Sequence, residues 1–310
     1  HEDVAVVVLT HDVCLLVEGA QIGKTHATEG NFNNHIGLPL TILNCPDDAD
    51  FLVLEMGTNH PGEIARLVDI AAPDVGIVTN IGNAHIEFFK TLDGTAAEKG
   101  ALLSRLPPDS FAVLDRDGAR YSILRSMASA PVANASFNDG QSVKLAAALG
   151  ENLPGRHNVL NARLAEVCAM RLGATESQCL EALKGFTNIG HRWRTLEWHG
   201  ATVIDDTYNA NPESMIAALD TFGGGIAVLG EMGELGEKSA EAHEKVLSFA
   251  KTLNLRRIVL VGAAWPQDVG AIYAADADDA RAKLAEIILP GDKILIKGSR
   301  AVGLERIVQY

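Results

Sequence analysis

The 310-residue sequence lacks the features that mark secreted, membrane-bound or nucleic-acid-binding proteins. Its few cysteines are scattered with no CxxC spacing, which argues against a disulfide framework or a zinc site and suits a reducing cytosol: Cys14, Cys45, Cys168 and Cys179. No apolar run reaches the ~18 residues that a membrane helix needs, and no signal peptide is evident. The formal net charge of −14 opposes general binding to nucleic acid, whose partners are basic. We therefore expect a cytoplasmic protein without a membrane span or a nucleic-acid partner.

The sequence does contain short apolar runs that alternate with helical patterns. The first part of the chain has FLVLE (51–55), a helix from Pro61, VGIVT (75–79), a helix near 95–106 and FAVLD (111–115). This βαβ rhythm predicts an α/β fold with a parallel sheet covered on both faces. Helical patterns over 158–172 and 176–183 follow, and turn-prone residues then place a domain boundary near Asn188.

The same rhythm restarts after that boundary. The second part has TVIDD (202–206), a helix from Pro212, AVLG (227–230), helices over 239–253 and 278–288, RIVLVG (257–262) and KILIKG (293–298). We therefore expect a parallel-sheet, P-loop-ATPase-like central domain over 18–188 and a smaller Rossmann-like α/β domain over 189–310.

Polar residues follow several predicted strands, where ligands bind in parallel α/β sheets. They are Glu55, then Asn80 and His85, then Asp205 and Asp206, then Lys297, Ser299 and Arg300. The triplet Gly23–Thr25 resembles the end of a phosphate-binding loop, and a carboxylate, a histidine and a threonine could hold Mg²⁺ against nucleotide phosphates. Each feature alone has a plainer explanation: a helix cap, a turn or a solvated charge. Their order along one α/β rhythm is what favours a nucleotide site.

Seven motifs together resemble the Mur ligases: TEGNFNNHIGLPLT (28–41), EMGTNHPGEI (55–64), TNIGNAHIEFF (79–89), GRHNVLNA (155–162), DDTYNANPESM (205–215), VLGEMGELGE (228–237) and KGSRAVGLE (297–305). They are most similar to the branch that adds D-Ala-D-Ala to UDP-N-acetylmuramoyl-tripeptide. The resemblance implies a cytoplasmic, monomeric ATP- and Mg²⁺-dependent amide ligase of peptidoglycan precursor synthesis. The substrate carboxylate would become an acyl phosphate, which the dipeptide amine would then attack.

The phosphate loop departs from the family pattern. In the family, GKT opens a helix, then a strand follows, and only then comes the TEGNFNN segment; here that helix is absent. Residues 1–17 would be a remnant of the N-terminal domain that holds the UDP end of the substrate in relatives. We expect that chain segments are omitted around 17–28 and before residue 1, because a parallel sheet cannot lose a crossover without rebuilding its topology. The alternatives are a nucleotide-binding homologue without catalysis and a folylpolyglutamate-synthase-like ligase.

The resemblance also implies roles for single residues. Catalysis would involve Lys24, His85 and Lys99, and the Mg²⁺ ligands would be Thr25, Glu55, His85 and a carbamate on Lys99. The nucleotide would meet Gly23, Lys24, Thr25, His157, Asn158, Asn161, Arg192, Asp206, Asn209 and Asn211. The muramoyl-peptide side would contain Asn31, Asn33 and Asn34, and the dipeptide side Lys297, Ser299 and Arg300.

Three of these assignments have competitors. Arg194 competes with Arg192 for the same alignment, and Asn158 is also a favoured type of helix N-cap. Lys99 would ordinarily be a solvated helix lysine. Relatives commonly carry an acid two residues after that lysine, where this chain has Ala101.

Overall fold

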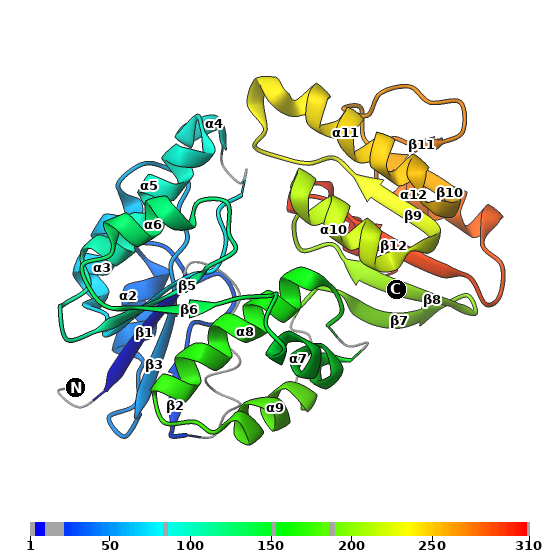
Figure 1. The fold of residues 1–310 in the computed structure, drawn as a ribbon. Coiled ribbons are helices and arrows are strands. Elements are labelled where there is room, and N and C mark those ends of the chain that lie inside the picture. Colours follow the sequence, from blue (N-terminus) through cyan, green and yellow to red (C-terminus); the bar gives the residue numbers. More distant parts are fainter. Residues whose placement is uncertain (1–3, 10–21, 83–85, 151–152, 186–189, 309–310) are drawn as a thin grey trace. The chain divides into compact units, whose positions relative to one another are not determined.

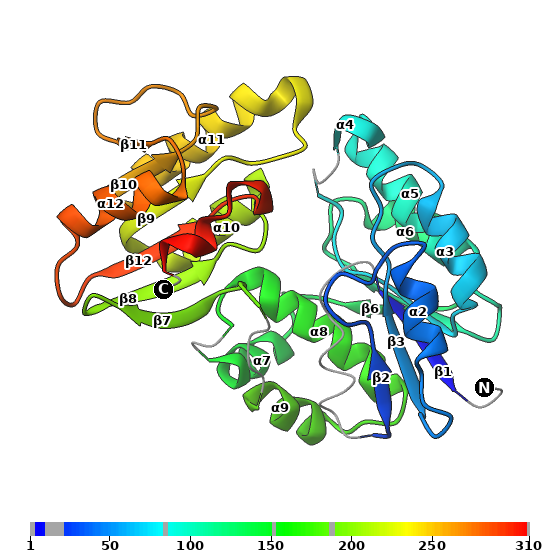
Figure 2. The same cartoon turned by 180° about the vertical axis from the view of Figure 1, so that it is seen from behind.

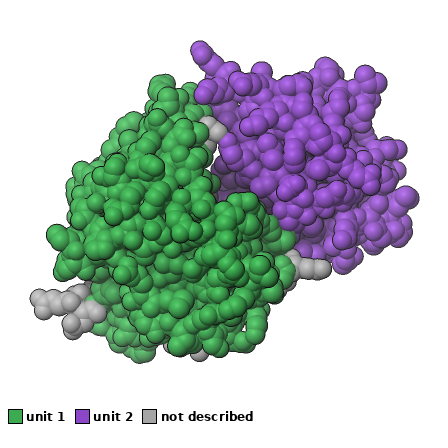
Figure 3. Space-filling model, viewed as in Figure 1, with its two compact units in different colours: residues 1–186 green, residues 187–310 purple. Residues whose placement is uncertain are grey.

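The computed structural model describes residues 4–9, 22–82, 86–150, 153–185 and 190–308. The chain divides into two compact units, residues 1–186 and 187–310 (Figure 3). The sequence had placed a boundary near Asn188, at the same turn-prone stretch. Each unit is an α/β structure built around one six-stranded sheet.

The sheet of the first unit is parallel throughout, with the strand order β2-β3-β1-β4-β5-β6. Its strands are β1 (Ala5–Leu9), β2 (Thr25–Ala27), β3 (Phe51–Glu55), β4 (Val75–Val78), β5 (Phe111–Asp115) and β6 (Val132–Ala135). Strand β1 lies inside the sheet, paired with β3 on one side and β4 on the other. The prediction that residues 1–17 are a remnant of a separate N-terminal domain is therefore wrong for this strand.

Helices cover both faces of this sheet, as Figures 1 and 2 show from opposite sides. One face packs against α2 (Gly37–Leu43), α3 (Glu63–Ala71), α5 (Leu92–Ser104) and α6 (Tyr121–Met127); the other packs against α7 (Gln141–Leu149), α8 (Arg156–Arg171) and α9 (Glu176–Lys184). The short helix α4 (Ile86–Phe89) precedes α5.

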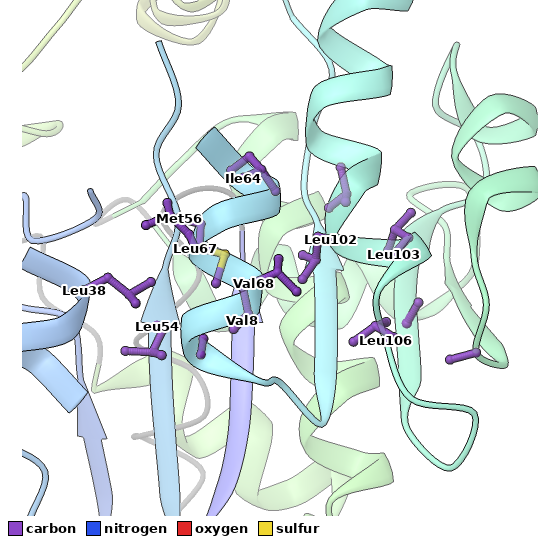
Figure 4. Close-up of a cluster of buried hydrophobic side chains, with 14 of the residues drawn as sticks. Val8, Leu38, Leu54, Met56, Ile64, Leu67, Val68, Leu102, Leu103 and Leu106 are labelled. Carbon is purple, nitrogen blue, oxygen red and sulfur yellow. The ribbon is translucent and has the colours of Figure 1, made fainter. Parts of the chain in front are cut away.

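Strand alternation decides which side chain enters which core. In β1, Val8 joins the first core and Val7 joins the second. In β3, Leu52 and Leu54 likewise face the first core, whereas Val53 faces the second. Figure 4 shows the first core, with leucines of α3 and α5 gathered over the strands. The strands are apolar on both faces, which is what a buried parallel sheet requires.

The sheet of the second unit has the order β11-β10-β9-β12-β8-β7, parallel except for the antiparallel edge strand β7. Its strands are β7 (Arg194–Trp198), β8 (Ala201–Asp206), β9 (Gly224–Gly230), β10 (Asn254–Val261), β11 (Ile272–Ala274) and β12 (Lys293–Lys297). Its helices are α10 (Pro212–Phe222), α11 (Ser239–Thr252), α12 (Ala277–Ile287) and the 3₁₀ turns η1 (Gly236–Lys238), η2 (Arg300–Val302) and η3 (Leu304–Ile307).

The second unit also has a core on each face of its sheet. Helices α10 and α11 pack on one face, and α12 with η3 packs on the other. Within the described ranges, no helix is both long enough and apolar enough to span a membrane.

Candidate functional site

The first sheet has an amino edge and a carboxyl edge, and the Gly23–Thr25 triplet lies at the amino edge. Thr25 opens β2 and pairs with Phe51, the first residue of β3. Glu55 ends β3 four residues later, about 13 Å further at ~3.3 Å per residue. Thr25 and Glu55 therefore cannot ligate one Mg²⁺ ion, whose bonds are ~2 Å long. The chain runs on from β2 directly into Thr28, whose N–H donates to Val53 O.

The triplet has a structural role in place of the predicted one. The Lys24 side chain is exposed and forms an ion pair with Asp48, and this hydrogen bond and charge raise the pKa of Lys24. The Lys24 N–H donates to Asp50 Oδ2 at 2.8 Å. A Cβ at Gly23 would lie only 2.7 Å from that same Asp50 oxygen, so glycine is needed there for close packing. The prediction that Gly23, Lys24 and Thr25 form a phosphate loop is wrong, because this triplet leads into the edge strand β2, which begins at Thr25, and not into a helix.

We accordingly predict that Lys24→Ala leaves ADP affinity within about twofold of the wild-type value, because an exposed ion pair contributes little. Isothermal titration with ADP would measure this, with Asp48→Ala as the matched control. A tenfold weakening in Lys24→Ala alone would return Lys24 to the nucleotide site.

The carboxyl edge of the first sheet brings together residues from the segments that follow β2 and β3. Asn33 Nδ2 donates to Glu55 Oε1 at 2.9 Å, and the Glu55 N–H donates to Thr28 Oγ1 at 3.0 Å. The Gly57 N–H donates to Asn33 O at 2.8 Å, and a Cβ on Gly57 would approach the Asn33 side chain to the same distance. The predicted substrate-facing segment is thus tied directly to the predicted metal-binding carboxylate.

A buried carboxylate holds the loop that follows Glu55. Glu98 of α5 is 8% exposed, and its oxygens accept the N–H groups of Gly62 at 2.7 Å and Ile64 at 2.9 Å. Glu98 also accepts the Thr58 hydroxyl at 3.2 Å. Because these amides form the N-terminus of α3, the carboxylate caps a helix that belongs to another part of the chain. The sequence analysis did not identify Glu98, because only the folded structure brings it to the amides at the start of α3.

Lys99 follows Glu98 and points to the same edge. Its Nζ donates to Asn80 O at 2.9 Å, just beyond the end of β4. Burial lowers the pKa of Lys99 to about 8, and the nearby Glu55 carboxylate opposes this shift. The structure therefore brings Glu55 and Lys99 into one electrostatic environment. His85, the other predicted ligand, lies outside the described residues.

The donors at this edge fit Mg²⁺, which prefers oxygen ligands. The Glu55 carboxylate and the Asn80 carbonyl suit that preference. Thr79 Oγ1 is buried without a hydrogen-bond partner in the described part of the chain. Among the same residues, no three His, Cys, Asp or Glu side chains gather into a metal-binding group. A cation site here would therefore need a further anionic oxygen ligand, such as a Lys99 carbamate would supply.

The predicted adenine-side residues lie in the first two turns of α8. Gly155 is the N-cap, so the alternative interpretation of Asn158 as the N-cap is wrong. Asn158 Nδ2 donates to Pro154 O at 2.7 Å, while Asn161 is half-buried and His157 exposed. At the start of this helix, the Arg156 guanidinium lies 4.2 Å from the centre of the Phe137 ring.

The carboxyl edge of the second sheet holds a buried lysine. Lys297, at the end of β12, is 4% exposed, and its Nζ donates to Asp206 Oδ2 at 2.7 Å and to Asn209 O at 3.0 Å. Asp206 also accepts the Trp193 N–H at 3.3 Å. Three of the predicted residues thus form one network, although the sequence reasoning had assigned Asp206 and Asn209 to the nucleotide and Lys297 to the dipeptide.

Two arginines of the second unit meet one aromatic ring. The Arg192 guanidinium lies 3.8 Å from the centre of the Tyr208 ring, and that of Arg300 lies 5.6 Å from it. Beside them His191 Nδ1 lies 2.6 Å from Asp205 Oδ2, and Asp205 is nearly fully buried. The competitor Arg194 begins β7 and is exposed. Sequence reasoning missed His191 and Tyr208, although both adjoin residues that it named.

Of the remaining predicted residues, two take part in hydrogen bonds within the protein and one is exposed. Asn34 Oδ1 accepts the N–H groups of Ile36 and Gly37, both at 3.0 Å, at the start of α2. The Ser299 N–H donates to Glu231 O at 3.0 Å, which links the loops after β12 and β9. Asn31 is exposed. Their substrate roles stay predictions.

Asn211 is the N-cap of α10, in a reciprocal capping box with Ser214. Asn211→Ala should therefore lower the free energy of unfolding of the second unit by about 1 kcal/mol, whereas Asn211→Ser should retain most of it. Urea unfolding followed by tryptophan fluorescence would measure this, because all three tryptophans lie beyond residue 187. Equal stability of the alanine and serine variants would contradict the capping role.

The fold and these clusters define a class of protein: a two-unit α/β protein with oxygen-bearing side chains at the carboxyl edge of one sheet and a buried lysine with two nearby arginines at that of the other. The Mur ligase middle-domain model matches residues 9–169, and the model described as Mur ligase, glutamate ligase domain matches residues 191–300. The chain belongs to the Mur ligase family.

Its relatives agree with this assignment. The UDP-N-acetylmuramoyl-tripeptide--D-alanyl-D-alanine ligase of Mycobacterium tuberculosis H37Rv is 33% identical, over 92% of this chain and 67% of the relative. MurF from Acinetobacter baumannii has a TM-score of 0.88 at 27% identity, covering 98% of this chain and 76% of that one. MurF from Thermotoga maritima in complex with ADP has a TM-score of 0.85 at 26% identity, covering 99% and 79%. The mycobacterial alignment extends over 341 residues, so the relative has residues that this 310-residue chain lacks.

Proposed function

We propose that the protein is an ATP-dependent amide ligase that adds D-alanyl-D-alanine to UDP-N-acetylmuramoyl-tripeptide, with ADP and phosphate as the other products. The observation that carries this proposal is the pair of clusters at the carboxyl edges of the two sheets, one acidic and oxygen-rich and one basic. Both lie within the residues that the two Mur ligase domain models match. A cytoplasmic monomer remains our expectation, and the buried free thiols of Cys45, Cys168 and Cys179 suit a reducing compartment.

The first chemical step joins two anions. The terminal carboxylate of the tripeptide attacks the γ-phosphorus of ATP, the bond to the β–γ bridging oxygen breaks, and ADP leaves. The dipeptide amine then attacks the acyl carbon, phosphate leaves with the bonding electrons, and the amine loses a proton. Because charge repulsion opposes the first step, catalysis should rest on positioning and charge neutralisation.

Chain residues supply these two functions as follows. Glu55, fixed by Asn33 and Thr28, would hold Mg²⁺ together with Lys99 in its carbamate form. When bound, the ion would neutralise phosphate charge. In the second unit, Arg192, Arg300 and Lys297 would contact anionic groups of nucleotide or dipeptide.

The phosphates themselves need a cradle beyond Gly23–Thr25. In parallel α/β sheets ligands bind at the carboxyl ends of the strands, and β1 lies between β3 and β4 in this sheet. Residues 10–21, which follow β1 in the sequence, lie outside the described residues. Residues 10–21 contain no lysine or arginine and one glycine. Positive charge for the phosphates must therefore come from other residues or from the ion. This is in keeping with the expectation that relatives have a segment here that the chain lacks.

The deciding experiment combines ATP, Mg²⁺, UDP-N-acetylmuramoyl-tripeptide and D-Ala-D-Ala with the purified chain. Phosphate release and the mass of the peptide product should both depend on the dipeptide. ADP binding without either product would favour the non-catalytic homologue. Ligation of glutamate to a folate, with none to the muramoyl peptide, would favour the folylpolyglutamate-synthase-like alternative.

A further inference from the structure

A carboxylate of helix α5 caps helix α3. Glu98 Oε2 accepts the Gly62 N–H at 2.7 Å, and Glu98 Oε1 accepts the Ile64 N–H at 2.9 Å. Gly62 is the N-cap of α3, has no side chain and adopts φ +90°. The first amides of a helix lack partners inside it, and a capping side chain normally comes from the N-cap residue itself. Here the acceptor comes from a residue 36 positions away, so the cap of α3 also fixes where α5 lies.

Apolar packing restrains mainly the carboxyl-terminal end of α5. Over residues 94–101 the sequence is GTAAEKGA, in which Glu98 and Lys99 are the only side chains larger than threonine. Leu102 and Leu103, which enter the first core, lie in the last turn of the helix, as Figure 4 shows. Small side chains interlock weakly with a neighbouring helix, because they form shallow ridges. We therefore expect the polar contacts of Glu98 and Lys99 to fix the amino-terminal half of α5 along its axis.

Glu98 and Lys99 reach the loops that follow two different strands. Glu98 holds the end of the loop from β3 to α3, and the Lys99 Nζ donates to Asn80 O at 2.9 Å, two residues after β4. Successive side chains of an α-helix point about 100° apart, so one turn of α5 contacts both loops. The first of these loops begins directly after Glu55. A shift of α5 away from that loop would therefore move Lys99 relative to Glu55.

We propose that Glu98 is a positioning residue, which holds Lys99 at the carboxyl edge of the sheet at a fixed distance from Glu55. The inference rests on the proposed function for the chemistry that Lys99 performs there. Glu98 itself would contact neither nucleotide nor substrate, because its two oxygens are directed to main-chain amides of α3. A displacement of about 1 Å in an active site can lower a rate about 100-fold, so loss of this cap should reduce catalysis without removing a reacting group.

Glu98→Gln tests the cap with almost no change in volume. Glutamine has one acceptor oxygen, and its NH₂ group would face the second amide, so one of the two bonds is lost. Glu166→Gln is the matched control, because Glu166 is fully buried in the same unit and accepts hydrogen bonds from Gln141 and Arg163. It lies in α8, on the other face of the sheet. Both variants should lower the free energy of unfolding, but only Glu98→Gln should displace Lys99.

The position of Lys99 can be measured without any activity. The whole chain, in buffer free of CO₂, is treated with trace acetic anhydride, and mass spectrometry compares acetylation of Lys99 with that of exposed Lys251 in the second unit. Glu98→Gln should speed the labelling of Lys99 by about fivefold, because a weakened cap lets α5 open more often. Glu166→Gln should leave the ratio within about twofold of the wild-type value, because it is a distant site.

Hydrogen exchange reports on the cap itself. The Gly62 and Ile64 amides should exchange faster in Glu98→Gln than in the wild type, and no faster in Glu166→Gln. Glu98→Asp keeps both acceptor oxygens on a shorter side chain, so it should fall between the wild type and Glu98→Gln in both measurements. It also serves as the test variant if Glu98→Gln does not fold. Unchanged exchange of both amides would show that the cap does not exist in solution, and the proposal would fail.

Kinetics separate the role of Glu98 from substrate binding. With ATP, Mg²⁺, UDP-N-acetylmuramoyl-tripeptide and D-Ala-D-Ala, Glu98→Gln should lower kcat by about 10- to 100-fold and leave the KM of the dipeptide within about twofold. Glu166→Gln should leave kcat within about twofold at a temperature at which all variants are folded. In a Lys99→Ala background, Glu98→Gln should have no further effect, because its action runs through Lys99.

The outcomes separate the role of Glu98 from the proposed function. Faster labelling of Lys99 in Glu98→Gln, without ligation by the wild type, would sustain the positioning of Lys99 and reject the ligase. Wild-type ligation with the same kcat in Glu98→Gln would sustain the ligase and overturn the role of Glu98. Labelling of Lys99 that is unchanged in Glu98→Gln, or that rises equally in Glu166→Gln, would overturn it as well, because Glu98 would then stabilise the unit without setting the position of Lys99.

Discussion

Lys297→Met should destabilise the second unit by about 3 kcal/mol, because it leaves a partly buried carboxylate without its partner. The Lys297 and Asp206 side chains are 5% and 16% exposed, and their charged atoms lie 2.7 Å apart. Methionine nearly matches the volume of the lysine stem, so the loss should come from the charge and not from a cavity. Asn209 O would lose a donor at the same time.

Urea unfolding monitored by tryptophan fluorescence would measure this effect in the second unit, which contains all three tryptophans. Lys297→Met/Asp206→Asn should recover much of the lost stability, because no charge is then left unpaired. The half-exposed pair Lys283–Asp279 provides the matched control, and Lys283→Met should hardly move the midpoint. Equal shifts of the urea midpoint for Lys297→Met and Lys283→Met would show that the buried ion pair stabilises the unit no more than the half-exposed one.

The regular elements could be predicted from the sequence where burial leaves a periodic signal. FLVLE and FAVLD are strands β3 and β5 with the predicted bounds, because both faces of each strand are buried. The missed elements lack such a signal. Strand β2 has only three residues, and α2 contains a glycine and a proline, which have low helix propensity. Tertiary packing of Leu38 against the first core stabilises α2 in spite of its composition.

The site could be predicted in part, and the errors in that prediction have one cause. Glu55 and Asn80 follow strands that share a carboxyl edge, so strand order alone predicts that they lie near each other. Lys24 and Thr25 matched a short motif. A motif does not specify the register of β2 against β3, and that register places both residues at the amino edge of the sheet, opposite Glu55. The pairing of Lys297 with Asp206 joins residues 91 positions apart, and the clustering of two arginines on Tyr208 likewise depends on the order of β8 and β12.

Lys99→Ala should lower the ligation rate by at least about 100-fold, the loss expected when a group that neutralises phosphate charge is removed. The Lys99 Nζ lies 2.9 Å from Asn80 O and interacts electrostatically with the Glu55 carboxylate. In the ammonium form it can satisfy both groups without a metal. In the carbamate form it would add a second anion beside the Glu55 carboxylate, and a bound cation would then be needed to neutralise the two charges. Lys144→Ala, which removes an exposed helix lysine, is the control and should retain full activity.

The two forms of Lys99 are distinguished by which small molecule restores the alanine variant. If the missing group is a carbamate, formate or acetate should recover part of the rate, because each supplies a carboxylate that fits the vacated space. Carbon-13 bicarbonate should in that case label the wild-type protein with one carbamate signal that Lys99→Ala lacks. Ala101 stands where relatives commonly have an acid, so Ala101→Glu should not abolish that signal. Restoration by methylammonium, with none by acetate and no carbamate signal, would leave Lys99 as an ammonium that neutralises the substrate phosphates directly.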